Sequence, residues 1–238
     1  METTAKAYRG DYMKRVLIGT PCYDGKIDVW YANSVVNCVR IAQAKGVFIH
    51  PIWLSYDALV QRARNDLMSI ALNQGYDCLV FVDSDVEFSP EWLLELIESE
   101  EDVIGGTYPK KGESESYPVK ALTDQNGELL LVPDSRGLLE VLGLGTGFVK
   151  ISRAALQALW DTSPVYKNTE TGTDNRMMCN VEVRNGVFMS EDIILFERLR
   201  DMGFRVWLDP KMTCNHTGNK KYVGDFLQYL KSITDTRL

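Results

Sequence analysis

Apolar and polar residues alternate along the first 107 positions in a way that predicts strands and helices in turn. Short apolar runs bounded by glycine, proline or aspartate indicate strands, and apolar residues spaced three and four apart indicate the helices between them. Such alternation is typical of a mostly parallel α/β sheet with helices on its faces. The expected strands are 15–20, 47–54, 79–82 and 102–106, and the expected helices are 29–45, a helix that 55–57 caps and Gly75 ends, and 90–99.

After Thr107 the apolar runs become shorter and turn residues separate them, which is typical of hairpins. The segments 161–189 and 209–221 are polar and predicted as loops, and residues 1–14 are predicted as a loose arm. The expected strands are about 117–123, 128–132, 138–142, 144–151 and 204–208, and the expected helices are 154–160, 190–202 and 222–233.

Composition and charge narrow the classes of protein. The chain has 238 residues, 45% of them hydrophobic, so it can bury a core. Its net charge of −7 disfavours a general nucleic-acid binder, whose phosphate contacts need a basic surface. The 5 cysteines have neither metal-finger nor redox spacing. The polar start is not a signal peptide, and no apolar run has the length of a membrane span. We therefore expect a cytoplasmic protein with reduced thiols.

Asp83, Ser84 and Asp85 follow the strand 79–82, which is expected to be buried on both faces. Residues i and i+2 of an extended chain point to the same side, so both carboxylates would converge where open α/β sheets bind ligands. Two carboxylates there repel each other unless a positive charge lies between them. A divalent cation such as Mg²⁺ or Mn²⁺ fits, because it takes oxygen ligands and bridges to phosphates. The alternative is an acidic turn ahead of the helix that begins near Ser89.

Two further motifs lie in the second half, and each has a structural alternative. Glu191 and Asp192 occupy the first turn of a predicted helix, where acids complement the helix dipole. Asp192 could instead act as the general base for an acceptor hydroxyl. His216, one of 2 histidines, lies in a polar segment and is either a surface residue or a ligand that completes a metal site with Asp85.

Three segments could contact a bound ligand or simply face solvent. Arg64 and Asn65 begin a predicted helix, and an arginine there can recognise a base, ribose or phosphate. Lys110 and Lys111 follow two glycines and can neutralise phosphate. The run Gly145-Thr146-Gly147 precedes a strand, so it is not a dinucleotide-binding fingerprint, and it suits close packing beside a sugar or phosphate.

The order of these motifs resembles that of glycosyltransferases of the GT-A fold, close to the inverting family-two enzymes. The motifs that carry the resemblance are Thr20-Pro21, Ala63-Arg64-Asn65, Asp83-Ser84-Asp85, Gly145-Thr146-Gly147, Ser190-Glu191-Asp192 and His216. The likeness spans about residues 15–218, and its short form is similar to the compact glycosyltransferases of bacteriophages and other viruses, which would place the protein in a host cytoplasm.

The resemblance implies a single domain over 1–238 with the GT-A (nucleotide-diphospho-sugar transferase) fold. Its mostly parallel central sheet would be flanked by helices and followed by a mixed or antiparallel second half. A nucleotide-binding half would cover about 15–107, an acceptor and catalytic half about 108–218, and a C-terminal helix 219–238.

The resemblance also implies roles for the site residues. Asp85 would bind Mn²⁺ or Mg²⁺ directly, Asp83 would hold the ribose or a metal-bound water, and His216 would be the third protein ligand. Asp192 would deprotonate the acceptor with help from Glu191, inverting the anomeric carbon. The nucleotide-sugar donor, expected to be a UDP-sugar, would contact Thr20, Pro21, Tyr23, Arg64, Asn65, Asp83, Ser84, Lys110, Gly145, Thr146 and Gly147.

Other functions remain open on the sequence. A nucleotidyltransferase of similar build usually has glycines, arginine and lysine directly after its first strand, and 20–26 lacks that richness. A non-catalytic module that binds a sugar nucleotide or calcium would also explain Asp-Ser-Asp. The acceptor is left open between a glycan, a protein and a hydroxymethylated DNA base, and the negative charge disfavours DNA unless lysines gather on one face.

Overall fold

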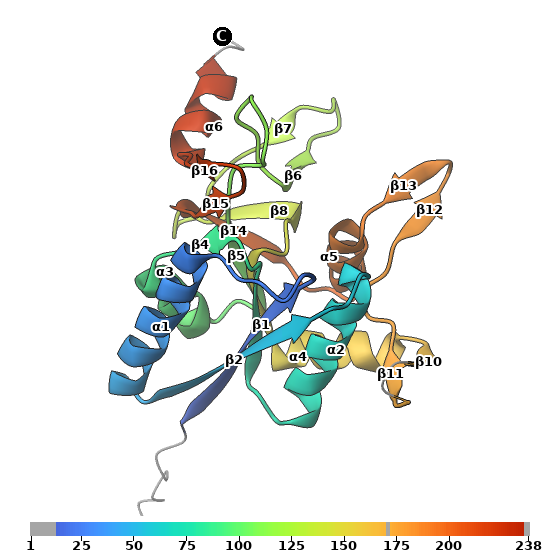
Figure 1. Cartoon of the computed structure of the whole chain (residues 1–238). Helices are drawn as coiled ribbons and strands as arrows, with labels where there is room; N and C mark the ends of the chain where they lie inside the picture. The colour runs from blue at the N-terminus through green and yellow to red at the C-terminus, as the bar shows by residue number, and fades with distance from the viewer. Residues whose placement is uncertain (1–12, 170–171, 236–238) are drawn as a thin grey trace, which may run out of the picture.

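A nine-stranded sheet runs through the computed structural model, which describes residues 13–169 and 172–235 (Figure 1). The predicted arm at 1–14 lies almost wholly outside these residues. In spatial order the strands are β2 (Val47–Ser55), β1 (Lys14–Cys22), β3 (Cys78–Val82), β9 (Phe148–Ser152), β5 (Val103–Thr107), β14 (Val206–Thr213), β8 (Leu139–Leu144), β6 (Val119–Thr123) and β7 (Leu129–Leu130).

Strand directions divide this sheet as the sequence predicts. β2, β1 and β3 are parallel neighbours, and β5 is parallel to β14. β9 is antiparallel to both β3 and β5, so β2, β1, β3, β5 and β14 all run the same way. β8, β6 and β7 then continue the sheet as antiparallel neighbours. The prediction of an α/β fold with a mostly parallel central sheet and a mixed second half is confirmed.

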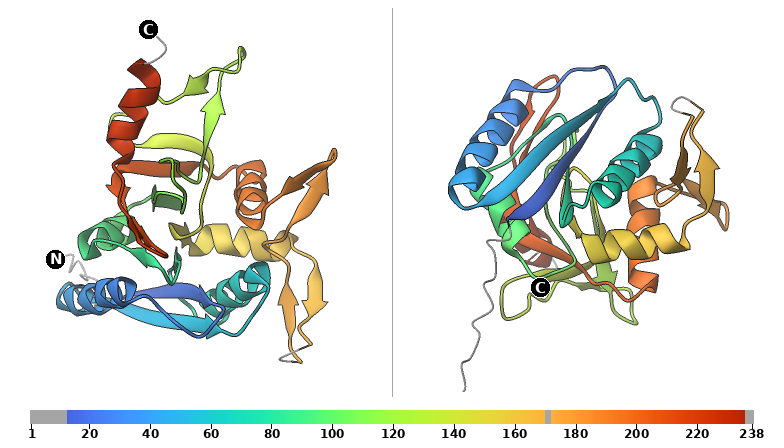
Figure 2. Two further views of the ribbon diagram at one scale, coloured as in Figure 1. Left: turned by 45° about the horizontal axis from the view of Figure 1, so that its top comes forward. Right: turned by 90° about the horizontal axis from the view of Figure 1, so that it is seen from below.

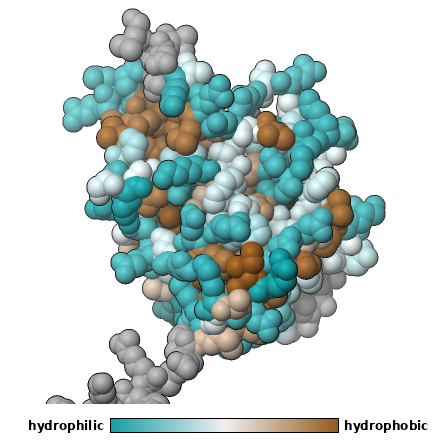
Figure 3. Space-filling model, turned by 90° about the vertical axis from the view of Figure 1, so that its left-hand side faces the viewer, coloured by the Kyte–Doolittle hydropathy of each residue, from teal (hydrophilic) through white to brown (hydrophobic). Residues whose placement is uncertain are grey.

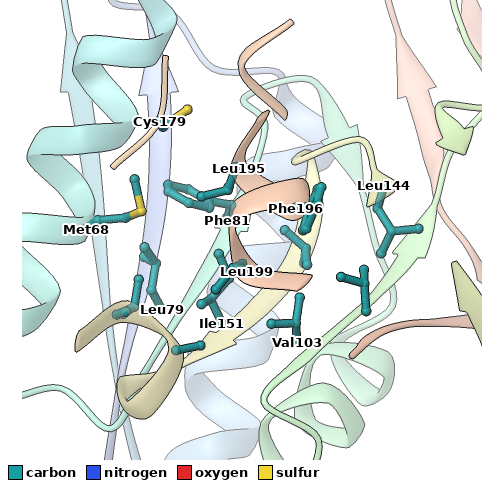
Figure 4. Close-up of a cluster of buried hydrophobic side chains, with 14 of the residues drawn as sticks. Met68, Leu79, Phe81, Val103, Leu144, Ile151, Cys179, Leu195, Phe196 and Leu199 are labelled. Atoms are coloured by element: carbon teal, nitrogen blue, oxygen red, sulfur yellow. The ribbon is translucent and has the colours of Figure 1, made fainter. Parts of the chain in front are cut away.

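Helices cover both faces of the sheet (Figures 1 and 2). One buried cluster joins α1 and α3 to β1 and β3, and a second joins α2, α4 and α5 to the opposite face of the same strands. Figure 4 shows the second cluster, where Phe81 and Leu79 of β3 meet Met68 of α2 and Leu195 of α5. The helices are α1 (Val29–Ala44), α2 (Val60–Asn73), α3 (Pro90–Glu98), α4 (Arg153–Thr162), α5 (Glu191–Asp201) and α6 (Phe226–Asp235).

The structure corrects three predicted boundaries. The strand expected over 144–151 begins only at Phe148, as β9, because Leu144 ends β8 and residues 145–147 form a turn. α2 begins at Val60, with Leu59 at its N-cap, because Tyr56 adopts a left-handed φ of 66° and turns the chain first. β14 extends to Thr213, so the sheet uses residues expected to be loop.

The two segments predicted as loops contain short strands. Within 161–189, residues 165–167 pair with 174–176 and residues 182–184 pair with 187–189, and both antiparallel pairs project from the body of the molecule in Figures 1 and 2. After β14, a short strand, β15, pairs with the strand that follows Asp85, and a second short strand, β16, pairs with β15. The short strands are β10 (Val165–Lys167), β11 (Asp174–Arg176), β12 (Glu182–Arg184), β13 (Val187–Met189), β4 (Val86–Glu87), β15 (Asn215–Thr217) and β16 (Lys221–Tyr222).

The cysteines are packing residues. All five are free and buried, which agrees with the prediction that Cys38 and Cys78 are buried thiols. Burial raises the pKa of Cys38 to about 12 and that of Cys78 to about 11, so neither is an activated nucleophile. Hydrophobic residues on the face shown in Figure 3 gather in separate patches between hydrophilic ones. Within the described part of the chain, no helix is both long and apolar enough to span a bilayer.

Gly105 allows β5 to lie close to β9. A Cβ built on Gly105 would be 2.6 Å from the carbonyl oxygen of Phe148, whereas one on Gly112 would meet nothing nearer than 3.7 Å. Because backbone cannot move aside cheaply, we expect Gly105→Ala to lower the free energy of unfolding by about 2 kcal/mol. Urea unfolding should show Gly112→Ala to be neutral or slightly stabilising. Equal stability of the two variants would contradict this explanation of the packing.

Candidate active site

The carboxyl ends of the parallel strands bring the site together. β1, β2, β3, β5 and β14 run in one direction, so their carboxyl ends share one edge of the sheet, where α/β proteins bind ligands. The residues at or after those ends supply most of one open pocket. Its lining is Pro21, Tyr23, Asp57, Ala58, Val60, Arg64, Asp83, Ser84, Asp85 and His216. We refer to it below as the edge pocket.

Arg64 of α2 joins the two acidic motifs. Its side chain is 3% exposed, Nη2 donates to Asp83 Oδ1 at 3.0 Å, and Nε lies 3.7 Å from Glu191 Oε1. The guanidinium lies 5.1 Å from the centre of the Phe81 ring. Burial acts to lower the pKa of Arg64, but the charges of Asp83 and Glu191 outweigh it and raise the pKa. Arg64 is therefore a permanent buried cation that fixes Asp83 and Glu191.

Asp85 has two nitrogen partners of its own. Lys111 Nζ lies 2.5 Å from Oδ2, and His216 Nε2 lies 3.3 Å from Oδ1. Burial acts to raise the pKa of Asp85, but hydrogen bonds and charges from His216 and Lys111 outweigh it, so the pKa falls below its ordinary value. Asp85 is thus a carboxylate at neutral pH.

His216 is oriented by the backbone after β5. Its Nδ1 lies 2.9 Å from the carbonyl oxygen of Pro109, which can only accept, so Nδ1 carries the hydrogen. Nε2 then faces Asp85, and its lone pair becomes available to a cation once Nε2 has given up its proton. Metal-binding histidines commonly have this arrangement, with the second nitrogen donating to a backbone carbonyl. The Tyr108 ring packs edge-on against the imidazole, at 5.1 Å between centroids.

The predicted metal ligands are only partly brought together. Asp85 and His216 meet, and their oxygen and nitrogen donors suit Mn²⁺ or Mg²⁺ with further ligand oxygens. Asp83 pairs with Arg64 instead. No three His, Cys, Asp or Glu side chains of the described residues are grouped so as to hold a metal ion. The repulsion that a cation between two carboxylates was expected to relieve is instead relieved by two protein cations, Arg64 on Asp83 and Lys111 on Asp85.

Asp192 lines a second pocket, which we call the Asp192 pocket. Ser190 Oγ donates to Asp192 Oδ1, and the backbone N–H of Ile193 lies 2.7 Å from the same oxygen. Among the described residues Oδ2 has no hydrogen-bond partner, so it is open to a bound hydroxyl. The pocket is lined by Lys110, Tyr117, Pro118, Val119, Lys120, Gly143, Leu144, Ser190, Asp192 and Ile193.

Tyr108 lies between the two acidic motifs. It is 7% exposed, and its hydroxyl accepts from the Gly147 N–H at 3.1 Å. Burial raises the pKa of Tyr108 well above its ordinary value, and Asp83 and Asp192 add to that rise. A Cβ on Gly147 would lie 2.7 Å from the Tyr108 ring, so this glycine leaves room for the tyrosine. The Gly145-Thr146-Gly147 turn thus packs against Tyr108, with Thr146 3% exposed.

Other predicted site residues have structural partners. The buried Thr20 hydroxyl lies 2.6 Å from Tyr31 Oη and is not in the lining of the edge pocket. Asn65 donates to the Cys179 carbonyl at 2.9 Å and accepts from the Cys179 N–H at 2.8 Å, so it holds the segment before α5. The Ser84 carbonyl accepts from the Asp28 N–H at 2.8 Å. Pro21 and Tyr23 line the edge pocket, and Lys110 lines the Asp192 pocket.

Asp57, Tyr108 and Tyr117 lie at the site although they were not among the predicted contacts. Asp57, expected to help cap a helix, instead lines the edge pocket and accepts from Arg62 Nε at 2.7 Å. Tyr117 lines the Asp192 pocket, and the Tyr108 ring packs against His216. Nothing in the sequence context of Tyr117 distinguishes it from a core residue. Only the position of Tyr108 directly after a strand could have indicated its role.

Comparisons with known proteins find likeness in structure alone. No family model matches the chain, and no curated protein sequence matches it. The structure of A197 from STIV is similar over 89% of this chain and 94% of that one, with 18% identity and a TM-score of 0.53. That is a likeness of fold.

Two glycosyltransferases are also among the structural neighbours. One is a Drosophila β-1,4-galactosyltransferase 7 mutant in complex with manganese, UDP-Gal and xylobiose, with a TM-score of 0.46, 14% identity and coverage of 89% of this chain and 71% of that one. The other is involved in glycosylation of the major capsid of PBCV-1, with a TM-score of 0.34, 12% identity and coverage of 61% and 62%.

Removing Arg64 should destabilise the fold through its two carboxylates. We expect Arg64→Met to lower the free energy of unfolding by about 3 kcal/mol, because Asp83 and Glu191 lose their buried partner. Adding Glu191→Gln should restore part of the loss, since the pair is coupled. Urea unfolding of both variants measures this, with Arg184→Met, from an exposed ion pair with Glu182, as a control that changes little. If Arg64→Met is as stable as that control, Arg64 does not hold the site together.

Proposed function

We propose that the protein is a metal-dependent glycosyltransferase of the GT-A type, which moves a sugar from a nucleotide-sugar, with UDP-sugar as the expected donor, to an acceptor hydroxyl. The observation that carries this proposal is the meeting of Asp85 and the oriented His216 in a pocket at the carboxyl edge of the sheet. A nucleotide diphosphate has the charge and the oxygen atoms to complete that donor set.

The edge pocket offers complementary parts for such a donor. Asp85 and His216 would hold the cation, which when bound neutralises negative charge on the leaving diphosphate. Pro21 and the exposed ring of Tyr23 provide an apolar wall for the base or ribose. Asp83, held by Arg64, is the acceptor available for a ribose hydroxyl. Arg64 itself is 3% exposed and shared between two acids, so its part is to position Asp83.

Asp192 is the proposed base. One of its oxygens is fixed by Ser190 and Ile193, which leaves the other to take the proton of the acceptor hydroxyl. The acceptor oxygen then bonds to the anomeric carbon as the bond from that carbon to the diphosphate breaks, with inversion. Glu191 pairs with Arg64, so it orients the site and does not itself take a proton.

Donor binding is testable by thermal shift with nucleotide diphosphates and nucleotide-sugars, each with Mn²⁺ and with EDTA. A ligand at saturating concentration stabilises the folded state by mass action, so we expect one nucleotide to raise Tm by about 5 °C with Mn²⁺. The shift should disappear with EDTA and in Asp85→Asn, and persist in Asp201→Asn, a control on the exposed end of α5. Absence of any nucleotide shift would refute the proposed donor site.

The base can be tested without knowledge of the acceptor, because water is a default acceptor. We expect Asp192→Asn to keep the nucleotide shift and to release UDP from the donor about 100-fold more slowly, which is within the range for loss of a general base. The measurement is coupled detection of UDP release, again with Asp201→Asn as the control. Undiminished release by Asp192→Asn would remove Asp192 from the mechanism.

A further inference from the structure

Lys111 occupies the side of Asp85 that His216 leaves open. Its ammonium contacts Oδ2 while the imidazole faces Oδ1, so both oxygens of one carboxylate are engaged by the protein. Lys111 follows β5, Asp85 follows β3 and His216 lies on β15, so three separate segments meet here. The contact places a protein charge beside the donor set of the proposed cation.

The lack of a side chain at Gly218 leaves room for the Lys111 side chain. A Cβ on Gly218 would lie 3.1 Å from Lys111 Cδ and 3.3 Å from Cε, so the absence of a side chain at Gly218 makes room for the aliphatic stem. The loop that carries Lys111 is closed by a hydrogen bond of 2.7 Å from the Lys110 N–H to the Ser116 carbonyl. Lys111 therefore reaches Asp85 over a glycine, from a loop with a defined shape.

The nearby lysines are engaged elsewhere. Lys221 pairs with Glu87 and lies 4.1 Å from the centre of the Trp30 ring, and Lys220 lies 5.1 Å from that of Tyr222. Among the described residues, Lys111 is the lysine that contacts Asp85. It is also half-open to solvent, with 38% of its side chain exposed, so it can leave without breaking the core.

We propose that Lys111 is a resident counter-cation, which neutralises Asp85 and gives way when a divalent cation and diphosphate bind. This inference rests on the proposed function. A divalent cation at Asp85 and the Lys111 ammonium repel each other, so binding of the metal alone is opposed. Once the lysine is displaced, the same ammonium lies at the edge of the site, where it can pair with a phosphate oxygen. Lys111 thus favours loading of metal together with nucleotide over metal alone.

The direct test is titration of the protein with Mn²⁺ alone, followed by the EPR signal of free Mn²⁺. We expect Lys111→Gln to bind Mn²⁺ about fivefold more tightly than the wild type, the fold-change that loss of one partly exposed ion pair gives. Gly218→Ala crowds the Lys111 side chain but keeps its charge, so it should change the Mn²⁺ affinity in the same direction. Lys45→Gln, which removes an exposed lysine paired with Glu98, is the charge-matched control.

The affinity for UDP should change in the opposite direction to the affinity for Mn²⁺. At saturating Mn²⁺, we expect calorimetry to show weaker UDP binding to Lys111→Gln than to the wild type, because a phosphate partner is lost. Tighter Mn²⁺ with weaker UDP supports the inference. The inference is overturned if the Mn²⁺ affinity of both Lys111→Gln and Gly218→Ala is equal to or below that of the wild type. It is also overturned if neither the variants nor the wild type bind Mn²⁺. The proposed function fails separately, if the wild type binds no nucleotide under any condition.

Discussion

The site depends on the ion pairs that the buried guanidinium of Arg64 makes with Asp83 and Glu191. Arg64 lies on α2, over a ring of β3, and faces carboxylates that follow β3 and begin α5. Because a buried charge must be paired, the positions of these three elements depend on one another. The two ion pairs orient Asp83 into the edge pocket and fix the start of α5, so that Asp192 lines the Asp192 pocket. Two pockets with different chemistry are therefore coupled by one side chain.

Parallel strands bring together residues that lie far apart in sequence. The strands that share one direction end at one edge, and each contributes side chains where it ends. The antiparallel β9 between β3 and β5 adds the glycine turn before it to that edge, where Gly147 makes room for Tyr108. Positive groups then balance the acids individually: Arg64 serves Asp83, and Lys111 serves Asp85. Each of the two aspartates thus has a protein cation as its partner.

The local pattern of apolar and polar residues was enough to predict most of the sheet. It also predicted the position of Asp83 to Asp85, because a short apolar run bounded by aspartates is typical of a buried strand, and the aspartates then lie where that strand ends. The partners of those acids could not be predicted, since they depend on how α2 and α5 pack on the sheet. Asn65 is an example: its neighbour Arg64 faces the site, while its own amide holds Cys179. The turn at 145–147 was assigned to a strand because its glycines lie between Leu144 and the apolar run that begins at Phe148. The short strands of 161–189 were missed because strands of three residues have no detectable period.

A crystal structure with Mn²⁺ and UDP, with anomalous scattering recorded at the manganese edge, would test the proposed donor site at the level of individual atoms. We expect one anomalous peak between Asp85 and His216, the diphosphate beside it, and the Lys111 ammonium withdrawn from Asp85 towards a phosphate oxygen. A manganese peak away from both residues, or UDP bound outside the edge pocket, would contradict the proposed site.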